Sequence, residues 1–284
     1  MPTTEGKIYL GSVLVASGAC TMDEDAVAYL TAIEGDGAGV TWAQAVAVSD
    51  FVVAQKASGA WAALKRLYFP IWAVAAANAR CMVSATSGTF VGGVTHGAGF
   101  VTGDGSTSYF DVGATTSTLG LSTGDVAIMR GIHIDGSSAH DACGVTSGTG
   151  TNSLAMLNYA SSHGSAGSTY YRQPGISAAA TLTGQGTDYR GIYIGSSIST
   201  ASRFLQRRRS GGTVVVKSFL ADGSIITNAN PYFLGRNNGG TLNLPTSGSE
   251  FVWSLGDGMT ETLAGSFTAD IETMWETCTG LTLF

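Results

Sequence analysis

Residues 250–260 read Glu-Phe-Val-Trp-Ser-Leu-Gly-Asp-Gly-Met-Thr, and this stretch decides the fold because a strand, a turn and a helix start follow one another within it. Alternation over Phe251–Gly256 predicts a strand with Phe251 and Trp253 on one face. The glycines that flank Asp257 supply turn chemistry. We therefore expect a β-structure to come before the C-terminal segment.

The residues after this turn have the spacing of a single helix. Apolar residues recur at intervals of four, four, three, one and three, which places them on one helical stripe. They are Leu263, Phe267, Ile271, Met274, Trp275 and Cys278. Gly280 supplies a helix stop. We predict a C-terminal helix over residues 260–279 that packs on a sheet formed by the middle of the chain.

Composition narrows the class of protein. Glycine makes up 40 of 284 residues, and charged residues only 12%, which is about half their usual share. Short apolar runs between Gly, Ser and Thr predict many strands joined by tight turns. The net charge of −6 disfavours a general nucleic-acid role. No apolar run reaches the ~18 residues of a membrane span.

Cysteine spacing argues against a zinc knuckle. Cys20, Cys81, Cys143 and Cys278 lie far apart and form no Cys-x-x-Cys pair. We expect mostly free buried thiols, although an even count leaves disulfides open.

The first part of the chain, residues 1–20, is predicted to be a strand-forming anchoring segment. Its apolar run after Lys7 resembles a secretion signal, but Gly11-Ser12 interrupts it and Ser17 stands where a lipoprotein box would carry Leu. The better interpretation is a strand pair, Lys7–Leu10 and Val13–Ala16, that turns at Gly11-Ser12. We therefore expect no signal peptide.

The second part, residues 21–75, is predicted to be helical. Thr21 with Glu24, and Thr41 with Gln44, have the spacing of capping boxes. After Gly59 a third helix is expected, carrying Trp61, Leu64, Leu67 and Tyr68, and Pro70 ends it. The inner face of the second helix is expected to hold Trp42, Ala45, Val46, Val52 and Val53. Each helix has one apolar side, so all three should pack on the β domain or on a neighbouring subunit.

The third part, residues 76–284, is predicted to be an antiparallel two-sheet jelly-roll sandwich that ends in the helix 260–279. Phe100–Val112 reads as a hairpin that turns at Gly103-Asp-Gly105, and Gly211-Gly212 reads as a tight turn. Turn signals at intervals of about 10–20 residues fit such a sandwich. The other expected strands are Asp125–Ile134, Ser153–Tyr159, Thr169–Arg172, Tyr189–Ile194, Ser202–Arg208, Thr213–Leu220 and Tyr232–Leu234.

Several of these segments together resemble a known family. The hairpin Phe100–Val112, the later Tyr232–Asn238, and the strand Phe251–Gly256 with Met259 and the terminal helix look like the concanavalin A-like, or laminin G-like, jelly roll. The form they resemble most occurs in virion structural proteins of tailed bacteriophages. There a helical segment like 23–70 precedes the jelly roll, and a turn similar to residues 254–260 opens the last helix. Residues 7–12, Lys-Ile-Tyr-Leu-Gly-Ser, are also similar to strands of phage particle proteins.

The acidic residues do not form an expected catalytic set. Glycosidases on this fold need two carboxyl groups about 5 Å apart for retaining cleavage, yet Glu250 is the only glutamate between Gly35 and Phe251. The run Asp23-Glu-Asp25 sits in a helix first turn, where the helix dipole explains it. We therefore expect no enzyme activity and no catalytic residue.

Metal and cofactor sites are not expected either. His133, Asp135, His140, Asp141 and Cys143 lie close in sequence and could in principle bind a metal, but their spacing matches no known site. We interpret them as strand and loop polarity, with His140–Cys143 in a Gly/Ser-rich loop. The resemblance to laminin G-like domains leaves calcium open at Asp104 or Asp111, without a ligand set.

One unusual feature is basic. Six of the fourteen basic residues fall between Tyr189 and Ala221, where no acid occurs. They are Arg190, Arg203, Arg207, Arg208, Arg209 and Lys217. On a strand, Arg203, Arg207 and Arg209 share one face and Arg208 points the other way. Two interpretations stay open: a contact patch for an acidic neighbour, a lipopolysaccharide phosphate or a glycan, or a charged edge strand that blocks unwanted pairing.

Tyrosines offer a second candidate surface. Tyr170, Tyr171, Tyr189 and Tyr193 could stack on a sugar, but alternation puts Tyr189 and Tyr193 on one face, which favours the core. The candidate contact residues for a partner or glycan are thus Arg203, Arg207, Arg208, Arg209, Tyr170 and Tyr171.

Three functions from different classes follow. The first is a structural virion protein, in capsid decoration or in the tail or a fibre, which contacts other virion proteins and self-associates as a trimer or another cyclic arrangement. The second is a carbohydrate-binding module for adsorption to a host-surface glycan. The third is a polysaccharide-degrading enzyme, against which the missing carboxylate pair argues. The resemblance implies a virion location, after assembly in the host cytoplasm.

Overall fold

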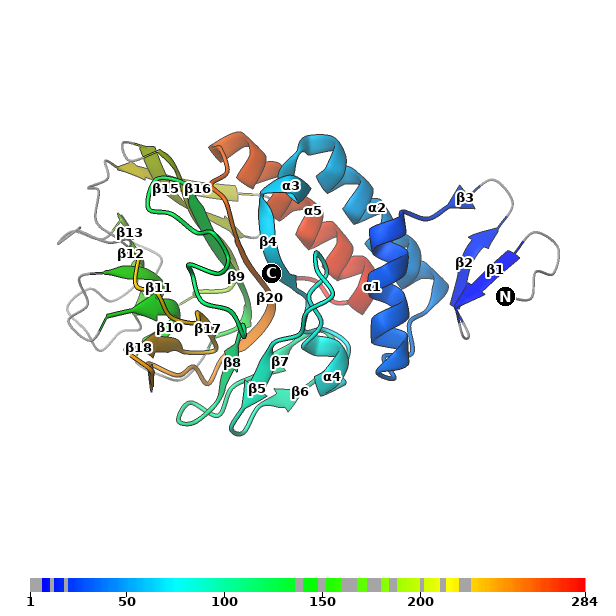
Figure 1. The fold of residues 1–284 in the computed structure, drawn as a ribbon, viewed down its shortest axis with the longest axis horizontal. Helices are drawn as coiled ribbons and strands as arrows, with labels where there is room; N and C mark the ends of the chain where they lie inside the picture. The colour runs from blue at the N-terminus through cyan, green and yellow to red at the C-terminus, as the bar shows by residue number, and fades with distance from the viewer. Residues whose placement is uncertain are drawn as a thin grey trace.

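The computed structural model describes most of the chain. The described residues are 7–10, 13–17, 20–135, 140–147, 152–159, 168–172, 180–183, 188–199, 202–209, 213–219 and 226–283. The molecule is mainly β, with two large sheets packed together and a helical layer that includes a C-terminal helix (Figure 1).

The larger sheet has eight strands within the described residues. Its strands are β4 (Leu64–Tyr68), β6 (Thr95–His96), β7 (Val101–Thr102), β9 (Val126–Ile134), β14 (Gly191–Ser199), β15 (Ser202–Arg209), β16 (Thr213–Phe219) and β20 (Ser249–Gly256). They run in the order β16-β15-β14-β9-β20-β7-β6, and β4 pairs with β20 beside β7. The strand that the sequence predicted at Phe251–Gly256 is thus central to the sheet.

The second sheet has six described strands and a three-stranded neighbour. The six are β10 (His140–Thr146), β11 (Ser153–Tyr159), β12 (Ser168–Arg172), β13 (Ala180–Leu182), β18 (Arg236–Asn238) and β19 (Thr241–Asn243). The other three are β5 (Thr89–Val91), β8 (Tyr109–Asp111) and β17 (Tyr232–Phe233). β10 and β18 pair in parallel, so the expectation of an entirely antiparallel sandwich is wrong at this pair. The jelly-roll connectivity itself stays a prediction.

The larger sheet is buried on both faces, which explains its long apolar runs. Ile128, Leu205 and Trp253 face the second sheet, whereas Met129, Phe204 and Phe251 face the helices. Each strand therefore contributes alternate residues to two separate cores. Figure 1 shows the resulting three layers: the smaller sheet, the larger sheet, and the helices.

The helical layer consists of α1 (Glu24–Gly35), α2 (Trp42–Ser58), the short α3 (Ala60–Ala63) and α4 (Ala75–Asn78), and α5 (Glu261–Thr279). Thr41 and Gln44 form the predicted capping box of α2. Thr260 caps α5, and Gly280 ends it at a φ of 69°, where glycine has no steric penalty. None of the described helices combines the length and hydropathy needed to span a membrane.

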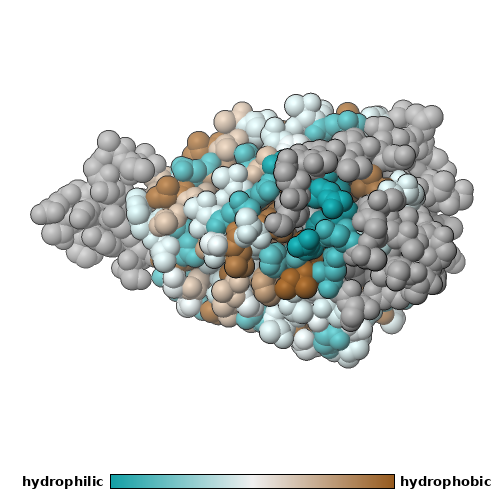
Figure 2. Space-filling model, turned by 180° about the vertical axis from the view of Figure 1, so that it is seen from behind, coloured by the Kyte–Doolittle hydropathy of each residue, from teal (hydrophilic) through white to brown (hydrophobic). Residues whose placement is uncertain are grey.

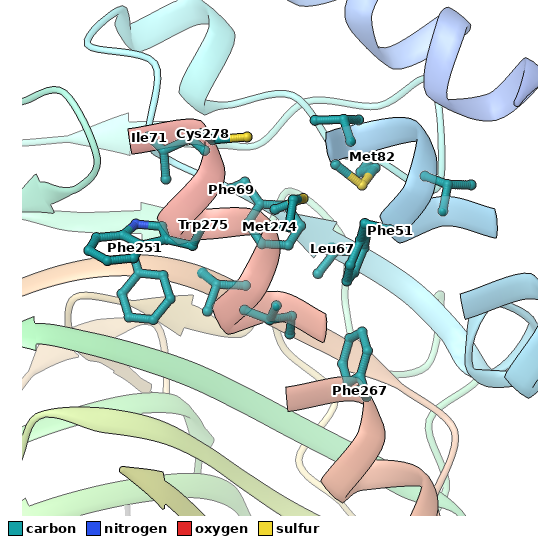
Figure 3. Close-up of a cluster of buried hydrophobic side chains, with 14 of the residues drawn as sticks. Phe51, Leu67, Phe69, Ile71, Met82, Phe251, Phe267, Met274, Trp275 and Cys278 are labelled. Carbon is teal, nitrogen blue, oxygen red and sulfur yellow. The ribbon is translucent and has the colours of Figure 1, made fainter. Parts of the chain in front are cut away.

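The core between helices and sheet is aromatic (Figure 3). Phe51 of α2 meets Phe69 edge-on at 5.6 Å and lies 6.2 Å from Phe267 of α5. Trp275 of α5 packs against Phe251 of β20 and donates its indole N–H to the Gly99 carbonyl at 2.7 Å. Of the two predicted alternatives, the structure shows the helices packed on the β domain. The helix predicted over 260–279 is confirmed.

A small separate sheet forms the N-terminal end. It consists of β1 (Lys7–Leu10), β2 (Val13–Ser17) and β3 (Cys20–Thr21), in that order. β1 and β2 are antiparallel, which confirms the predicted strand pair, while its turn at residues 11–12 lies outside the described residues. Figure 1 shows this sheet beyond the helices, on the side away from the sandwich.

Several local predictions are wrong. The third helix ends at Ala63, and Leu64–Tyr68 form strand β4 against β20 instead. Phe100–Val112 is not a hairpin, because β7 pairs with β20 whereas β8 pairs with β5 and β17.

Other corrections concern caps and exposure. Asp23 rather than Thr21 caps α1 by accepting the Asp25 N–H. Val53 of α2 is 51% exposed rather than part of the inner face. His140–Cys143 belong to strand β10 rather than to a loop. The predicted turn at Gly211-Gly212 lies outside the described residues, although β15 and β16 do pair.

Candidate functional site

The arginine-rich strand β15 lies inside the sheet. Arg203 and Arg207 are each only 1% exposed, and they share a strand face with Leu205, which lies between the sheets. β16 pairs with β15 on its outer side, so the interpretation of β15 as a charged edge strand is wrong. These two arginines have almost no surface to offer a partner, whereas Arg208 and Arg209 of the same strand are partly exposed.

Arg207 illustrates how a buried guanidinium is satisfied. Its Nη2 donates to the backbone carbonyls of Asp188 at 2.6 Å and Arg190 at 2.7 Å, and its guanidinium lies 5.3 Å from the Tyr193 ring. Burial lowers the pKa of Arg207. Carbonyl acceptors and an aromatic face replace the lost water. Arg207 therefore holds the start of β14 in place instead of binding a ligand.

The more exposed arginines are also paired. Arg208 forms an ion pair with Glu272 of α5 and so ties the helix to the sheet. Arg190 and Arg209 both face Asp188, at 3.1 and 3.6 Å. The hydrogen bond from Arg190 helps hold the pKa of Asp188 below its ordinary value. Exposed pairs of this kind contribute little stability, but they leave two cations around one carboxylate at the surface.

The candidate tyrosines whose side chains the structure describes are buried and offer no stacking surface. Tyr171 is fully buried between the sheets, and Tyr189 and Tyr193 are buried as well. The Tyr193 hydroxyl donates to the Tyr189 carbonyl at 2.9 Å. This confirms the core interpretation of Tyr189 and Tyr193, while the Tyr170 side chain lies outside the described residues.

The residues considered for metal binding have other contacts. His133 stacks on Phe100 and lies 5.1 Å from Trp275, and burial lowers its pKa. Asp135 accepts the Tyr189 N–H at 2.9 Å. The side chains of His140 and Asp141 are not among those described. In the described part of the chain, no three His, Cys, Asp or Glu residues are grouped to hold a metal.

The two aspartates left open for calcium each organise a loop. Asp104 accepts the backbone N–H groups of Ser106, Thr107 and Ser108 within 2.9 Å. Asp111 accepts the Gly113 N–H at 2.7 Å and the Asn230 amide at 3.0 Å. Both carboxylates are thus used locally.

Sequence reasoning did not predict one buried ion pair. Arg130 of β9 and Glu250 of β20 form an ion pair with both side chains fully buried, and Glu250 also accepts the Trp253 indole N–H at 2.6 Å. The sequence feature that could have indicated this pair is a single Arg or Glu within each of two largely apolar strands. The pair is closed from solvent, so it acts on stability rather than on a ligand.

A groove between α2 and α5 has a mainly apolar lining. It has a volume of about 330 Å³, with Phe51 and Met274 among its lining residues. Small side chains of α2 line one side, namely Ala43, Val46, Ala47 and Ala54, and Asp50, Asp270, Thr273 and Thr277 complete it. Asp270 accepts the Gln55 amide at 2.7 Å. Such a lining suits an apolar segment flanked by a cation.

A second groove is neutral and polar. It has a volume of about 530 Å³ and lies on the loops at residues 116–123 and 226–228, with hydroxyls and an amide around Leu121 and Ile226. The lining polar residues are Thr116, Ser117, Ser122, Thr123 and Asn228. Among the coloured residues on the face shown in Figure 2, hydrophobic residues form separate small groups between hydrophilic ones.

Comparison with known proteins gives no family. No protein-family model matches the sequence, and no curated protein matches it. The fold is similar to Trypanosoma rangeli sialidase in complex with sialic acid, with a TM-score of 0.49 and 8% identity over 74% of this chain and 33% of that one. It is also similar to the CBM2 module of the evolved Dit of Lactobacillus casei BL23 phage J-1, with a TM-score of 0.37 and 11% identity over 60% of this chain and 81% of that one. The chain thus spans about a third of the sialidase's length.

Proposed function

We propose that the protein is a structural component of a bacteriophage particle, in capsid decoration or in the tail or a fibre, which acts through protein–protein contacts and breaks no bonds. The observation that carries this proposal is the N-terminal sheet β1-β2-β3, which stands apart from the sandwich (Figure 1). A sheet this small is marginal on its own. The resemblance of residues 7–12, 23–70 and 254–260 to phage virion proteins supplies the context.

The outer strands of that sheet supply a physical means of attachment. β1 and β3 each pair on one side only within the described residues, so backbone N–H and C=O groups face outward. Such edges add strands from a neighbouring chain. A sheet that completes itself on a partner gains the missing hydrogen bonds.

Charge is distributed in a way that favours a basic partner. Helices α1, α2 and α5 contain eight acids, namely Glu24, Asp25, Glu34, Asp50, Glu261, Asp270, Glu272 and Glu276, and one base, Lys56. That lysine is already paired with Asp23 and Asp25. An acidic layer of this kind attracts cationic surfaces and repels copies of itself.

Attachment to particles tests the proposal. We expect antibody labelling to locate the protein on purified virions, and purified protein to co-sediment with particles that lack it. Removal of residues 1–20 should weaken co-sedimentation at least tenfold while the near-UV circular dichroism of the sandwich stays unchanged. Purified virions without the protein would contradict the proposal.

The polar loop groove favours one second candidate, glycan binding in host adsorption. Neutral hydroxyls and an amide around an apolar floor suit a sugar, which offers hydroxyls and C–H faces. A glycan array followed by calorimetry tests it. We expect Ser122→Arg, which fills the groove, to abolish binding, and Thr262→Arg, on the exposed face of α5, to leave binding unchanged. No binding by the unaltered protein would remove this candidate.

A further inference from the structure

The groove between α2 and α5 and the N-terminal strands have complementary properties. The groove is apolar along α2, and its Asp50 has no hydrogen-bond or ion-pair partner among the described residues. The strand sequences are apolar and carry one cation: Lys7-Ile-Tyr-Leu in β1 and Val-Leu-Val-Ala-Ser in β2. Apolar side chains with a lysine beside them match an apolar groove with an acid at its rim.

The geometry anchors the segment after the chain's own strands on a different face of α2 from the groove. The segment that follows β3 is fixed to α2 by Asp23, whose N–H donates to Ser49 Oγ at 2.9 Å and whose carboxylate binds Lys56 at 2.8 Å. Ser49 and Lys56 lie on one face of α2, seven residues apart. Ala43, Ala47 and Ala54 lie about 120–160° around the helix from that face, at ~100° per residue.

The connection between the strands and the helices is short. Only Met22 and Asp23 separate Thr21, the last residue of β3, from the first residue of α1. β2 also contacts α2 within the same chain. A terminal element joined by one short connection is readily exchanged between copies.

We propose that the α2–α5 groove of one copy accepts the N-terminal strands of a second copy, so that Lys7 of the incoming strand approaches Asp50. This inference rests on the proposed assembly function and names one of its contacts. It also fits the acidic helical layer, because acidic layers cannot stack on each other, whereas a strand with a lysine can approach one. The arrangement is head-to-tail, and it closes into a ring or extends according to the rotation between copies.

Complementary variants of the full chain test the proposal by analytical ultracentrifugation. Ala47→Glu places a charge in the groove, and Ala57→Glu places the same charge on an exposed position of α2 outside it. Ala47→Glu is the groove variant. A third variant, the strand variant, carries Leu14→Glu and Val15→Glu, because neighbouring strand residues point to opposite faces and one of them is affected whichever face docks.

We expect Ala47→Glu to self-associate at least tenfold more weakly than the unaltered protein, and Ala57→Glu to self-associate as strongly as the unaltered protein. The strand variant should also be monomeric. A mixture of the groove variant and the strand variant should form a one-to-one complex, because one supplies intact strands and the other an intact groove. Misfolding of either variant would be seen as loss of near-UV circular dichroism and would not produce that complex.

Other outcomes overturn the proposal. Self-association that survives Ala47→Glu means that another surface joins the copies. An unaltered protein that stays monomeric, with strands that Ala47→Glu exposes to protease, means that the groove holds its own strands. A monomer that still co-sediments with virions contradicts this inference but leaves the proposed assembly function intact. An oligomer that is absent from virions contradicts the assembly function but leaves the contact between copies intact.

Discussion

The Arg130 guanidinium donates to the Glu250 carboxylate between the two sheets, where neither side chain has any exposed surface. The pair joins the adjacent central strands β9 and β20, and the Trp253 indole completes the hydrogen bonding of the carboxylate. A buried pair of this kind is costly to break from one side, because the remaining charge has no water to replace its partner.

Arg130→Met is therefore expected to lower the free energy of unfolding by about 3–5 kcal/mol. Adding Glu250→Gln should recover part of that loss, because the amide oxygen still accepts the Trp253 N–H and no charge is left buried. Urea denaturation of the two single variants and the double variant measures the coupling. Additive losses in the double variant would contradict a direct interaction.

Gly195→Ala should destabilise the sandwich by about 1–3 kcal/mol through overpacking. A Cβ at this position would lie 2.4 Å from Cδ2 of the buried Tyr171 ring, and two buried sheets leave that ring no free direction. Gly35→Ala is the matched control, since a Cβ there meets no atom within 4 Å. Thermal unfolding should show a loss for Gly195→Ala and no loss for Gly35→Ala.

The loop at Asp104 should make stability depend on acid pH. The hydrogen bond from the Thr107 hydroxyl, together with the backbone N–H groups of Ser106, Thr107 and Ser108, holds the pKa of Asp104 well below its ordinary value. A carboxyl with a lowered folded-state pKa stabilises the fold above its unfolded pKa of about 3.9 and loses that contribution as pH falls. We expect Asp104→Asn to reduce the fall in urea midpoint between pH 5 and pH 2. An unchanged slope would mean that the loop opens before the carboxyl is protonated.

The buried thiols should be unreactive in the native protein. Cys81, Cys143 and Cys278 are buried thiols outside any disulfide, and burial raises the pKa of Cys278 to about 12. Because the thiolate is the reactive form, we expect these three sites to resist maleimide at pH 7 and to react fully in urea. Peptide mapping by mass spectrometry gives the site-resolved result, and rapid native labelling of Cys278 would show that α5 detaches.

Sequence reasoning succeeded where a local pattern has one structural solution. The stripe from Leu263 to Cys278 admits only a helix of that length, and the alternation at Phe251–Gly256 admits a strand. The helix prediction was wrong at Leu64–Tyr68, because the apolar spacing after Trp61 fits both a helix and a strand. The partner strand β20 is remote in sequence.

The candidate site was harder to predict for a related reason. Period-two alternation correctly separated Arg208 from Arg203 and Arg207, but it could not say which side of the strand was buried. The acceptors of Arg207 are backbone carbonyls at Asp188 and Arg190, which no side-chain pattern reveals. The α2–α5 groove was also missed, because Ala and Val on a helix read equally well as core or as surface.

The pairing of β4 with β20 has a consequence for biosynthesis. The ribosome completes Leu64–Tyr68 long before it reaches Ser249–Gly256, and α1 and α2 share their core with α5, which is made later still. The apolar faces of the nascent helices therefore stay uncovered until α5 has left the ribosome. Contacts of such long range favour slow folding and prolong the exposure of aggregation-prone surface.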